Sequence, residues 1–146
     1  MRTKILEKAA ALIQQNTAQN APQGSEPYCV LALIDTDGSP IATTITASKA
    51  DGLRWITFCT GFGSTKPGRI EKRGRASVCF NTGGEYNITL IGGITIETQP
   101  EVKREMWYDG LANHFSGPDD PNYCVLRFTP ERYHLLIDRK EAAGAL

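Results

Sequence analysis

Apolar residues recur at helical spacing near the start of the chain. Lysine, glutamate and glutamine stand between them, so one face is apolar and the other polar. The pattern predicts an amphipathic helix over residues 3–19. The segment 20–27 then contains two prolines and a glycine, through which a helix does not continue. The apolar stripe is formed by Ile5, Leu6, Ala9, Leu12 and Ile13.

From residue 28 the pattern changes to short runs rich in β-branched and aromatic residues. Turn signals at Asp37-Gly38 and Asp51-Gly52 separate the first of these runs. We therefore expect three antiparallel strands joined by hairpins, followed by a loop with a short helix and then a fourth strand. The predicted strands cover residues 28–34, 40–48, 53–60 and 76–80.

The second half of the chain predicts a long bent strand, a helix and a closing section. Residues 85–98 are long for one strand, and Gly92-Gly93 in their middle predict a bulge or sharp bend. The later elements are a helix over 100–111, a loop over 116–122, and one or two strands over 123–137 that Pro130 interrupts.

The strands cluster together instead of alternating with helices. This order favours a mainly β fold with flanking α-helices, in which an antiparallel sheet curls into a barrel over about residues 28–138. A length of 146 residues fits one domain, which we expect to span residues 1–146.

Charge and composition narrow the range of functions. Sixteen basic and sixteen acidic residues cancel, so we expect neither nucleic acid nor a membrane surface as a partner. No apolar run is long enough for a membrane span, and the first residues lack a signal peptide, which predicts a cytoplasmic protein. Four scattered cysteines without paired spacing predict reduced thiols and no metal site.

The stretch 58–75 contains the most informative polar residues. A strand is followed by a Gly-Phe-Gly turn, and Ser64, Thr65 and Lys66 then arrive together just before a helix. Hydroxyl groups, free backbone N–H groups and a positive charge are what a phosphate requires. The spacing is not that of a P-loop. From the residues alone, an ordinary solvated turn remains the alternative.

A second polar stretch lies in the predicted strand 40–48. Alternation places Thr44, Thr46 and Ser48 on one face, and Lys49 follows before the turn. Small hydroxyl residues leave space and hydrogen-bonding groups for a flat polar ring. Threonines on a solvated strand would produce the same pattern.

Together these segments resemble a known family over nearly the whole chain. TTITASK, FCT, GFGSTK, a short basic helix and ASVCF resemble the FMN-binding split barrel of pyridoxamine 5'-phosphate oxidase-like proteins. EMWYDGL and FSGPDDPNYCVLRFTPE resemble its short general-stress-protein branch more closely. The resemblance implies an antiparallel split β-barrel and a homodimer with FMN in a cleft between the two subunits.

The resemblance also assigns roles to individual residues. Cys59 and Thr60 would lie beside the ribityl-phosphate end of FMN, and Ser64, Thr65 and Lys66 would hold the phosphate. Asn87 would reach the flavin from the partner subunit. The flavin ring and ribityl chain would be lined by Thr44, Ile45, Thr46, Ala47, Ser48 and Lys49.

The chain departs from the fuller oxidases at several positions. Thr65 and Thr44 stand where those enzymes usually have arginine, and Pro67 removes an N–H group from the start of the helix, so weaker FMN binding is expected. The sequence also stops soon after TPERYHLLIDRK, without the segment that binds pyridoxal phosphate in the true oxidases. We therefore expect no oxidation of pyridoxamine phosphate.

Two functions follow from the resemblance. The first is an FMN-dependent oxidoreductase acting on an unidentified small molecule; the alternative is a non-catalytic, stress-related protein that carries flavin, haem or a deazaflavin. No nucleophile with a base and an orienting partner is evident, so the catalytic residues stay unassigned and the cofactor would supply the chemistry. His114 and Trp107 are candidates for the cleft, although packing roles are favoured for both.

Overall fold

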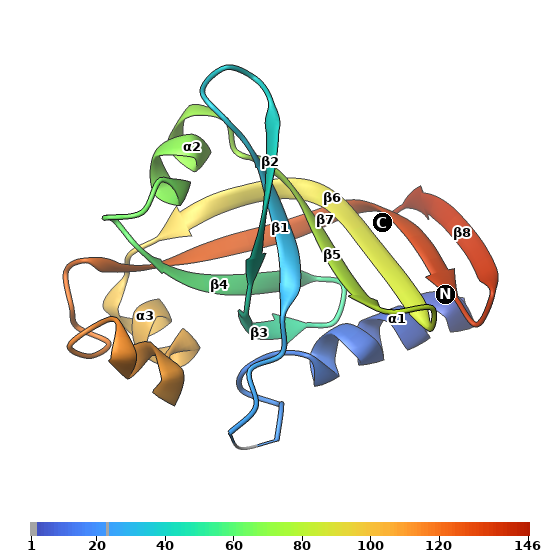
Figure 1. Ribbon diagram of the computed structural model, residues 1–146, viewed down its shortest axis with the longest axis horizontal. Coiled ribbons are helices and arrows are strands. Elements are labelled where there is room, and N and C mark those ends of the chain that lie inside the picture. Colours follow the sequence, from blue (N-terminus) through green and yellow to red (C-terminus); the bar gives the residue numbers. More distant parts are fainter. Residues whose placement is uncertain (1–2, 23) are drawn as a thin grey trace.

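The computed structural model describes residues 3–22 and 24–146. Gln23, within the predicted proline- and glycine-rich linker, lies outside the described residues, as do the first two residues of the predicted domain. Antiparallel strands form one curled sheet in the order β2-β1-β5-β6-β7-β4-β3, with β8 paired to β7 (Figure 1). Their bounds are β1 Cys29–Ile34, β2 Pro40–Ile45, β3 Ala47–Asp51, β4 Trp55–Gly61, β5 Arg75–Thr82, β6 Tyr86–Glu97, β7 Tyr123–Ile137 and β8 Lys140–Ala145. The predicted mainly β split-barrel fold is confirmed.

The predicted strand 40–48 is in fact two strands that lie at opposite edges of the sheet. β2 pairs with β1, whereas β3 pairs with β4, and only Thr46 separates them. The prediction of one strand was wrong because the alternating pattern continues through Thr46 and does not show that the pairing partner changes. A short connection between the two edges bends the sheet toward a barrel.

The predicted bend in the long strand is confirmed. β6 is one strand of twelve residues, and its register with β7 shifts between Ile91 and Gly92. A side chain on Gly92 would collide with the backbone of Thr129, so this position requires glycine. Pro130 lies opposite Gly92 in β7, which continues as a single strand through the proline.

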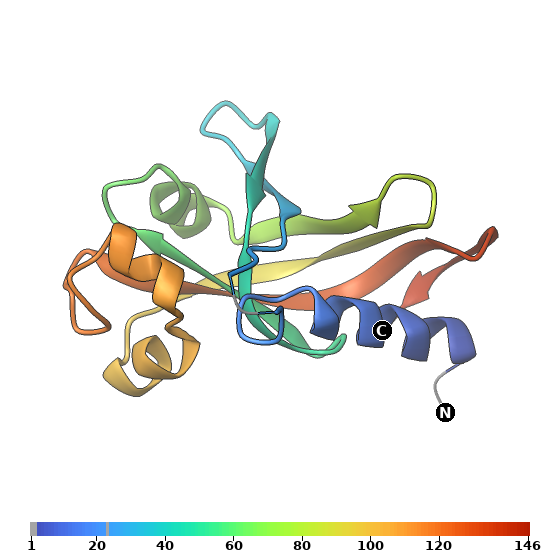
Figure 2. The same cartoon turned by 60° about the horizontal axis from the view of Figure 1, so that its bottom comes forward.

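Helices cover parts of the sheet. α1 (Lys4–Gln15) contacts β3 and β7, α2 (Lys66–Lys72) contacts β1 and β6, and α3 (Pro100–Met106) contacts β4 and β7. Both views show α1 and α2 far apart on opposite sides of the molecule, with α3 beside the end of β4 (Figures 1 and 2). Within the described part of the chain, no helix has the length and apolar character needed to cross a bilayer.

Two of the predicted helices are shorter than expected. α1 ends at Gln15, because the Asn16 side chain donates to the Leu12 carbonyl and the chain then turns to pair Ala18 with Ala47. The predicted helix 100–111 breaks at Trp107, whose extended backbone separates α3 from the 3₁₀ helix η1 (Asp109–Asn113).

Two apolar clusters stabilise this arrangement. The larger fills the inside of the curled sheet, where Phe58, Phe80 and Phe128 are almost fully buried. The smaller joins α3 and η1 to the sheet around Tyr123 and Met106. All four cysteines are free thiols, as expected. The smaller cluster fixes α3 and η1 beside the end of β4, where the candidate site lies.

Candidate functional site

A cavity of about 520 Å³ lies where β4 ends. Four of the predicted cofactor-binding residues line it: Thr46, Cys59, Thr60 and Ser64. The other walls come from the segment before β1, from Tyr108 and η1, and from the loop that leads into β7. This volume is in the range of small-molecule and cofactor sites.

Two hydroxyl groups face each other at the mouth of this cavity. The Thr60 and Ser64 oxygens lie 3.1 Å apart, and Ser64 also accepts weakly from the Lys66 backbone N–H at 3.4 Å. Thr65 is exposed, and its side chain does not cap α2. The turn therefore brings the Ser64 hydroxyl to Thr60 at the cavity, whereas Thr65 and Lys66, the other residues predicted to hold the phosphate, do not line the cavity.

Lys66 supplies the positive charge at this turn. Burial lowers the pKa of its ammonium group, and the neighbouring Arg69 lowers it further. Arg69 itself pairs with Asp35 at 3.2 Å, so its charge is already balanced. Lys66 has no ion pair among the described residues. A half-buried cation beside another cation is a favourable place for an anion.

Three of the backbone N–H groups of the turn already have partners within the chain. Asn122 receives two of them: its backbone oxygen accepts from Phe62 at 2.8 Å, and its side-chain oxygen accepts from Gly63 at 3.0 Å. The Ser64 N–H bonds back to Gly61. The loop before β7 therefore fixes the shape of the turn through Asn122.

Asn122 is a site residue that the sequence analysis missed. It stands in a Pro-Asn-Tyr sequence that reads as an ordinary loop, and its partners are about 60 positions away. Asp120 holds the loop by accepting from the Ser116 and Asn122 N–H groups, each at 2.9 Å. Buried Lys103 donates to the Asp120 carbonyl at 2.9 Å. No local pattern indicated this connection.

The segment from Thr44 to Lys49 is divided between three environments, because the strand breaks within it. Thr44 is exposed on β2, Ile45 packs against the apolar core, and Ala47 is fully buried. Thr46 alone lines the cavity. The expectation that Thr44, Thr46 and Ser48 share one face of a strand was therefore wrong.

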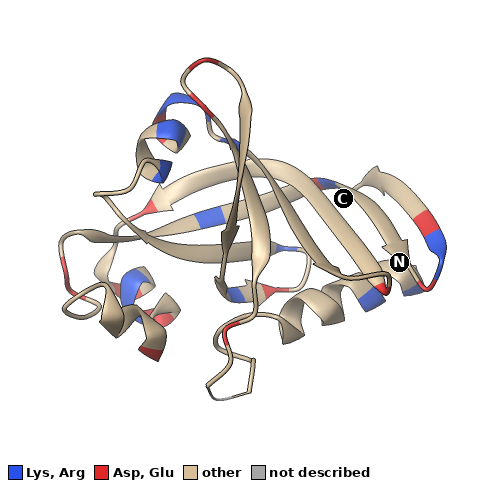
Figure 3. Ribbon diagram, viewed as in Figure 1, with Lys and Arg blue, Asp and Glu red and all other residues tan. Residues whose placement is uncertain are grey.

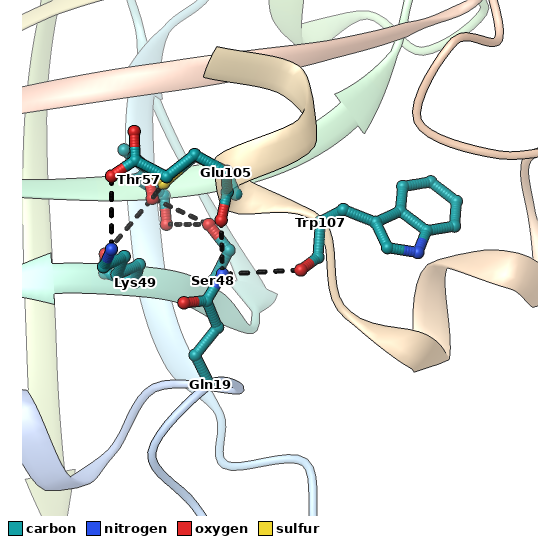
Figure 4. Close-up of polar contacts among 7 residues, drawn as sticks. Gln19, Ser48, Lys49, Thr57, Glu105 and Trp107 are labelled. Atoms are coloured by element: carbon teal, nitrogen blue, oxygen red, sulfur yellow. Dashed lines mark hydrogen bonds and ion pairs between the residues drawn. The ribbon is translucent and has the colours of Figure 1, made fainter. Parts of the chain in front are cut away.

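Ser48 and Lys49 lie in a polar cluster (Figure 4) and do not line the cavity. The Ser48 hydroxyl is fully buried and lies 2.7 Å from the Thr57 hydroxyl, while Lys49 pairs with Glu105 at 3.2 Å. Gln19 donates to the carbonyl oxygens of Glu105 and Trp107. These contacts join β3, β4, α3 and the segment after α1.

Asn87 lies far from the cavity within the same chain. It stands near the start of β6 and accepts a hydrogen bond from the Cys79 thiol at 2.9 Å. It lines a separate hollow with His134 and Glu141. Ten residues of β6 separate Asn87 from Glu97, the position level with Cys59 across β7. At about 3.3 Å per residue this separation is on the order of 30 Å.

Cys59 lines the cavity as a neutral thiol. Burial raises its pKa to about 11, against weaker opposing effects of hydrogen bonds to Tyr123 and Ser48. Its sulfur lies 3.5 Å from the Tyr123 hydroxyl and 3.4 Å from the Met106 carbonyl. A protonated thiol is a poor nucleophile at neutral pH, so Cys59 serves as an apolar wall.

Aromatic residues close the other side of the cavity. Tyr108, His114 and Phe115 line it, whereas Trp107 packs edge-on against Tyr123 with ring centres 5.4 Å apart. In Figure 4 the Trp107 ring points away from the polar cluster around Ser48. Trp107 thus packs against Tyr123, as favoured from the sequence, and it also lines a second cavity. Among the described residues, no group of histidine, cysteine and carboxylate side chains is placed to hold a metal ion.

A curled antiparallel sheet with a cavity at the end of β4, lined by the Thr60 and Ser64 side chains, defines a split β-barrel. The chain belongs to the pyridoxamine 5'-phosphate oxidase family, whose sequence pattern matches residues 8–137. No curated protein matches the chain. The family predicted from the sequence motifs is confirmed.

Solved structures agree with this fold. A protein related to general stress protein 26, from Clostridium acetobutylicum, has a TM-score of 0.80 at 22% identity, covering 100% of this chain and 97% of its own. An FMN-binding protein from Nostoc punctiforme has a TM-score of 0.71 at 15% identity, covering 100% and 98%. A heme-binding protein from Mycobacterium smegmatis has a TM-score of 0.74 at 17% identity, covering 99% of this chain and 59% of its own.

Proposed function

We propose that this chain binds FMN and acts as an FMN-dependent oxidoreductase on a small organic molecule. The observation that carries the proposal is the turn at the cavity, where the Thr60 and Ser64 hydroxyls lie 3.1 Å apart and the Lys66 backbone N–H donates to Ser64. Membership of the pyridoxamine 5'-phosphate oxidase family and the structural likeness to an FMN-binding protein support it.

The residues present fit a phosphate group. Lys66 has no ion pair among the described side chains, and its charge is disfavoured until an anion arrives. The hydroxyls of Thr60, Ser64 and Thr65 supply hydrogen-bond donors. They stand in place of the bidentate contacts that an arginine would make, so binding depends strongly on the single ammonium group.

The remaining walls suit the rest of the cofactor. Cys59 and Thr46 would lie along the ribityl chain and ring, and Ser48 and Lys49 would support that wall from behind through Thr57 and Glu105. The bound flavin would supply hydride transfer. The chain itself would orient the cofactor, limit water through its aromatic wall and hold the phosphate at the turn.

A homodimer is part of the proposal. Asn87 lies too far from the Ser64 turn to contact a ligand held there by its own chain, so it would reach the flavin only from a second copy. Tyr28 supports this arrangement, because its side chain is 64% exposed although it lines the cavity. Equilibrium ultracentrifugation tests it, and a monomer that retains FMN would contradict the shared cleft.

Haem is a second candidate ligand. His114 is exposed at the cavity wall, where a neutral imidazole could bind iron, and a structural neighbour binds heme. If haem is the ligand, we propose that the protein is a carrier without catalytic turnover. His114→Ala would then abolish haem binding.

Identification of the co-purifying ligand tests the proposal directly. The protein is purified without added cofactor, denatured, and the released small molecules are analysed by mass spectrometry and visible absorbance. FMN in the extract, or saturable binding of added FMN, is the expected result. Absence of both would overturn the proposal. Reduced holoprotein is then mixed with oxygen and candidate acceptors, and reoxidation no faster than that of free FMN would favour the carrier.

A further inference from the structure

A second cavity, of about 800 Å³, adjoins the first. The two share Glu26, Tyr28 and Tyr108 as walls, so they are direct neighbours. The second cavity lies between the segment after α1 and the segment that joins α3 to η1. If FMN occupies the first cavity, the second is the open space next to it.

Aromatic rings surround the junction of the two cavities. Tyr28 and Tyr108 line both cavities, and Trp107 adds a third aromatic side chain to the second. The Glu26 carboxylate lies where a side chain on Gly110 would stand, and the Tyr108 ring edge is 3.3 Å from the same point. A carboxylate and an aromatic ring are therefore held together over Gly110.

The charge of the junction is negative and unbalanced. Glu26 and Asp109 form no hydrogen bond or ion pair through their side chains with other described residues. None of the described residues that line either cavity is lysine or arginine. Burial, and then negative charge that includes Glu26, raises the pKa of Tyr108.

Positive charge prevails near the turn that is proposed to hold the phosphate. Figure 3 shows basic positions gathered on α2 and an acidic position on the segment leading into β1. A phosphate at Lys66 and a cation at Glu26 would each meet an opposite charge, whereas an anionic substrate at Glu26 would be repelled. Aromatic faces attract cations as well, and do so most strongly where water is partly excluded.

We infer that the junction of the two cavities binds the positively charged group of an organic substrate, such as an amine or a quaternary ammonium compound. Glu26 supplies the counter-charge, and Tyr28, Tyr108 and Trp107 supply the aromatic faces. The inference rests on the proposed function, in which FMN fills the first cavity. It assigns the class of substrate that this function leaves open.

Three probes of similar shape and different charge test the inference. Benzyltrimethylammonium, benzyl alcohol and benzenesulfonate are titrated separately into the full-length protein, with and without FMN, and binding is followed by calorimetry. We expect saturable binding of the cation at least about tenfold tighter than that of the other two. Equal affinity for the cation and the neutral probe would overturn the inference.

Matched variants locate the site. Glu26→Gln removes the charge at the junction and should weaken cation binding about tenfold, whereas Glu7→Gln removes an exposed charge from α1 and should leave it unchanged. Asp109→Asn removes a second negative charge from the second cavity and should also weaken cation binding. Unchanged cation affinity in both Glu26→Gln and Asp109→Asn would refute the site.

Flavin binding is measured on the same variants, which separates the two proposals. Asp109→Asn should keep the FMN affinity of the parent protein, because Asp109 lines the second cavity and not the first. A protein that binds FMN but does not prefer the cation would contradict the substrate class alone. A protein that prefers the cation but binds no FMN would contradict the cofactor alone.

Discussion

The carbonyl oxygen of Thr129 occupies the space that a side chain on Gly92 would need. Gly92 lies where the register between β6 and β7 shifts, directly opposite Pro130. The two strands can approach closely here because one residue has no side chain and the other donates no N–H group. This contact bends the sheet and brings its two edges toward each other.

Gly92→Ala should therefore destabilise the protein by about 2–4 kcal/mol, because backbone atoms must move to admit the methyl group. Gly93→Ala is the matched control. Its methyl group would meet only the flexible Glu131 side chain at 3.6 Å and the Gly74 carbonyl at 3.7 Å. Urea denaturation of both variants provides the comparison, and equal midpoints would show that the bulge tolerates a side chain.

Lys66→Ala should weaken FMN binding by about 1–3 kcal/mol, because it removes the one unpaired ammonium group at the hydroxyl turn. Lys72→Ala, in the last turn of the same helix, is the control for a general loss of charge. Flavin fluorescence measures both affinities. If Lys66→Ala binds FMN as tightly as Lys72→Ala, the phosphate is held elsewhere.

Asn122→Ala should lower both the stability of the turn and the affinity for FMN, because Gly63 loses its side-chain acceptor. Asn122→Asp keeps an acceptor for the Gly63 N–H but adds a negative charge near the phosphate. We expect it to recover the thermal stability while FMN affinity stays low. Full recovery of both properties would mean that the charge lies outside the range of the ligand.

The Cys59 thiol should resist alkylation at pH 8, since burial raises its pKa to about 11 from 9.0. A raised pKa keeps the thiol protonated, so its thiolate fraction at this pH is about a hundredfold below that of an ordinary cysteine. The rate should rise as the pH increases toward that pKa. Peptide mapping after iodoacetamide treatment measures the alkylation rate of Cys59, which is compared with the rate for free glutathione. Alkylation as fast as that of glutathione would indicate an activated cysteine.

Much of the sheet was predictable, because each strand carries its own local pattern. The bend at Gly92-Gly93 was visible as two glycines in an otherwise β-branched run. β8 was missed because its sequence, Lys-Glu-Ala-Ala-Gly-Ala, has weak strand preference. It forms because Asp138 and Arg139 both adopt left-handed backbone angles, as a two-residue hairpin turn requires.

The candidate site was predictable only in part, because local patterns reveal only those site residues that are close together in the sequence. Ser64, Thr65 and Lys66 are adjacent in sequence, so their shared turn could be recognised from local chemistry. The break at Thr46 and the contact of Asn122 with Gly63 depend on which distant segments meet. Residue patterns within one strand or loop contain no information about such partners.

The single residue between β2 and β3 links ligand binding to the integrity of the whole fold. Thr46 reaches the cavity wall only when β2 has joined one edge of the sheet and β3 the other. A ligand that contacts Thr46 together with the end of β4 therefore has no site on a partly open chain. Such a ligand, at free concentration L, raises the unfolding free energy by RT ln(1 + L/Kd), which is about 2.7 kcal/mol at a concentration one hundred times Kd. The melting temperature should accordingly rise with ligand concentration, and it can serve as a screen for the natural ligand.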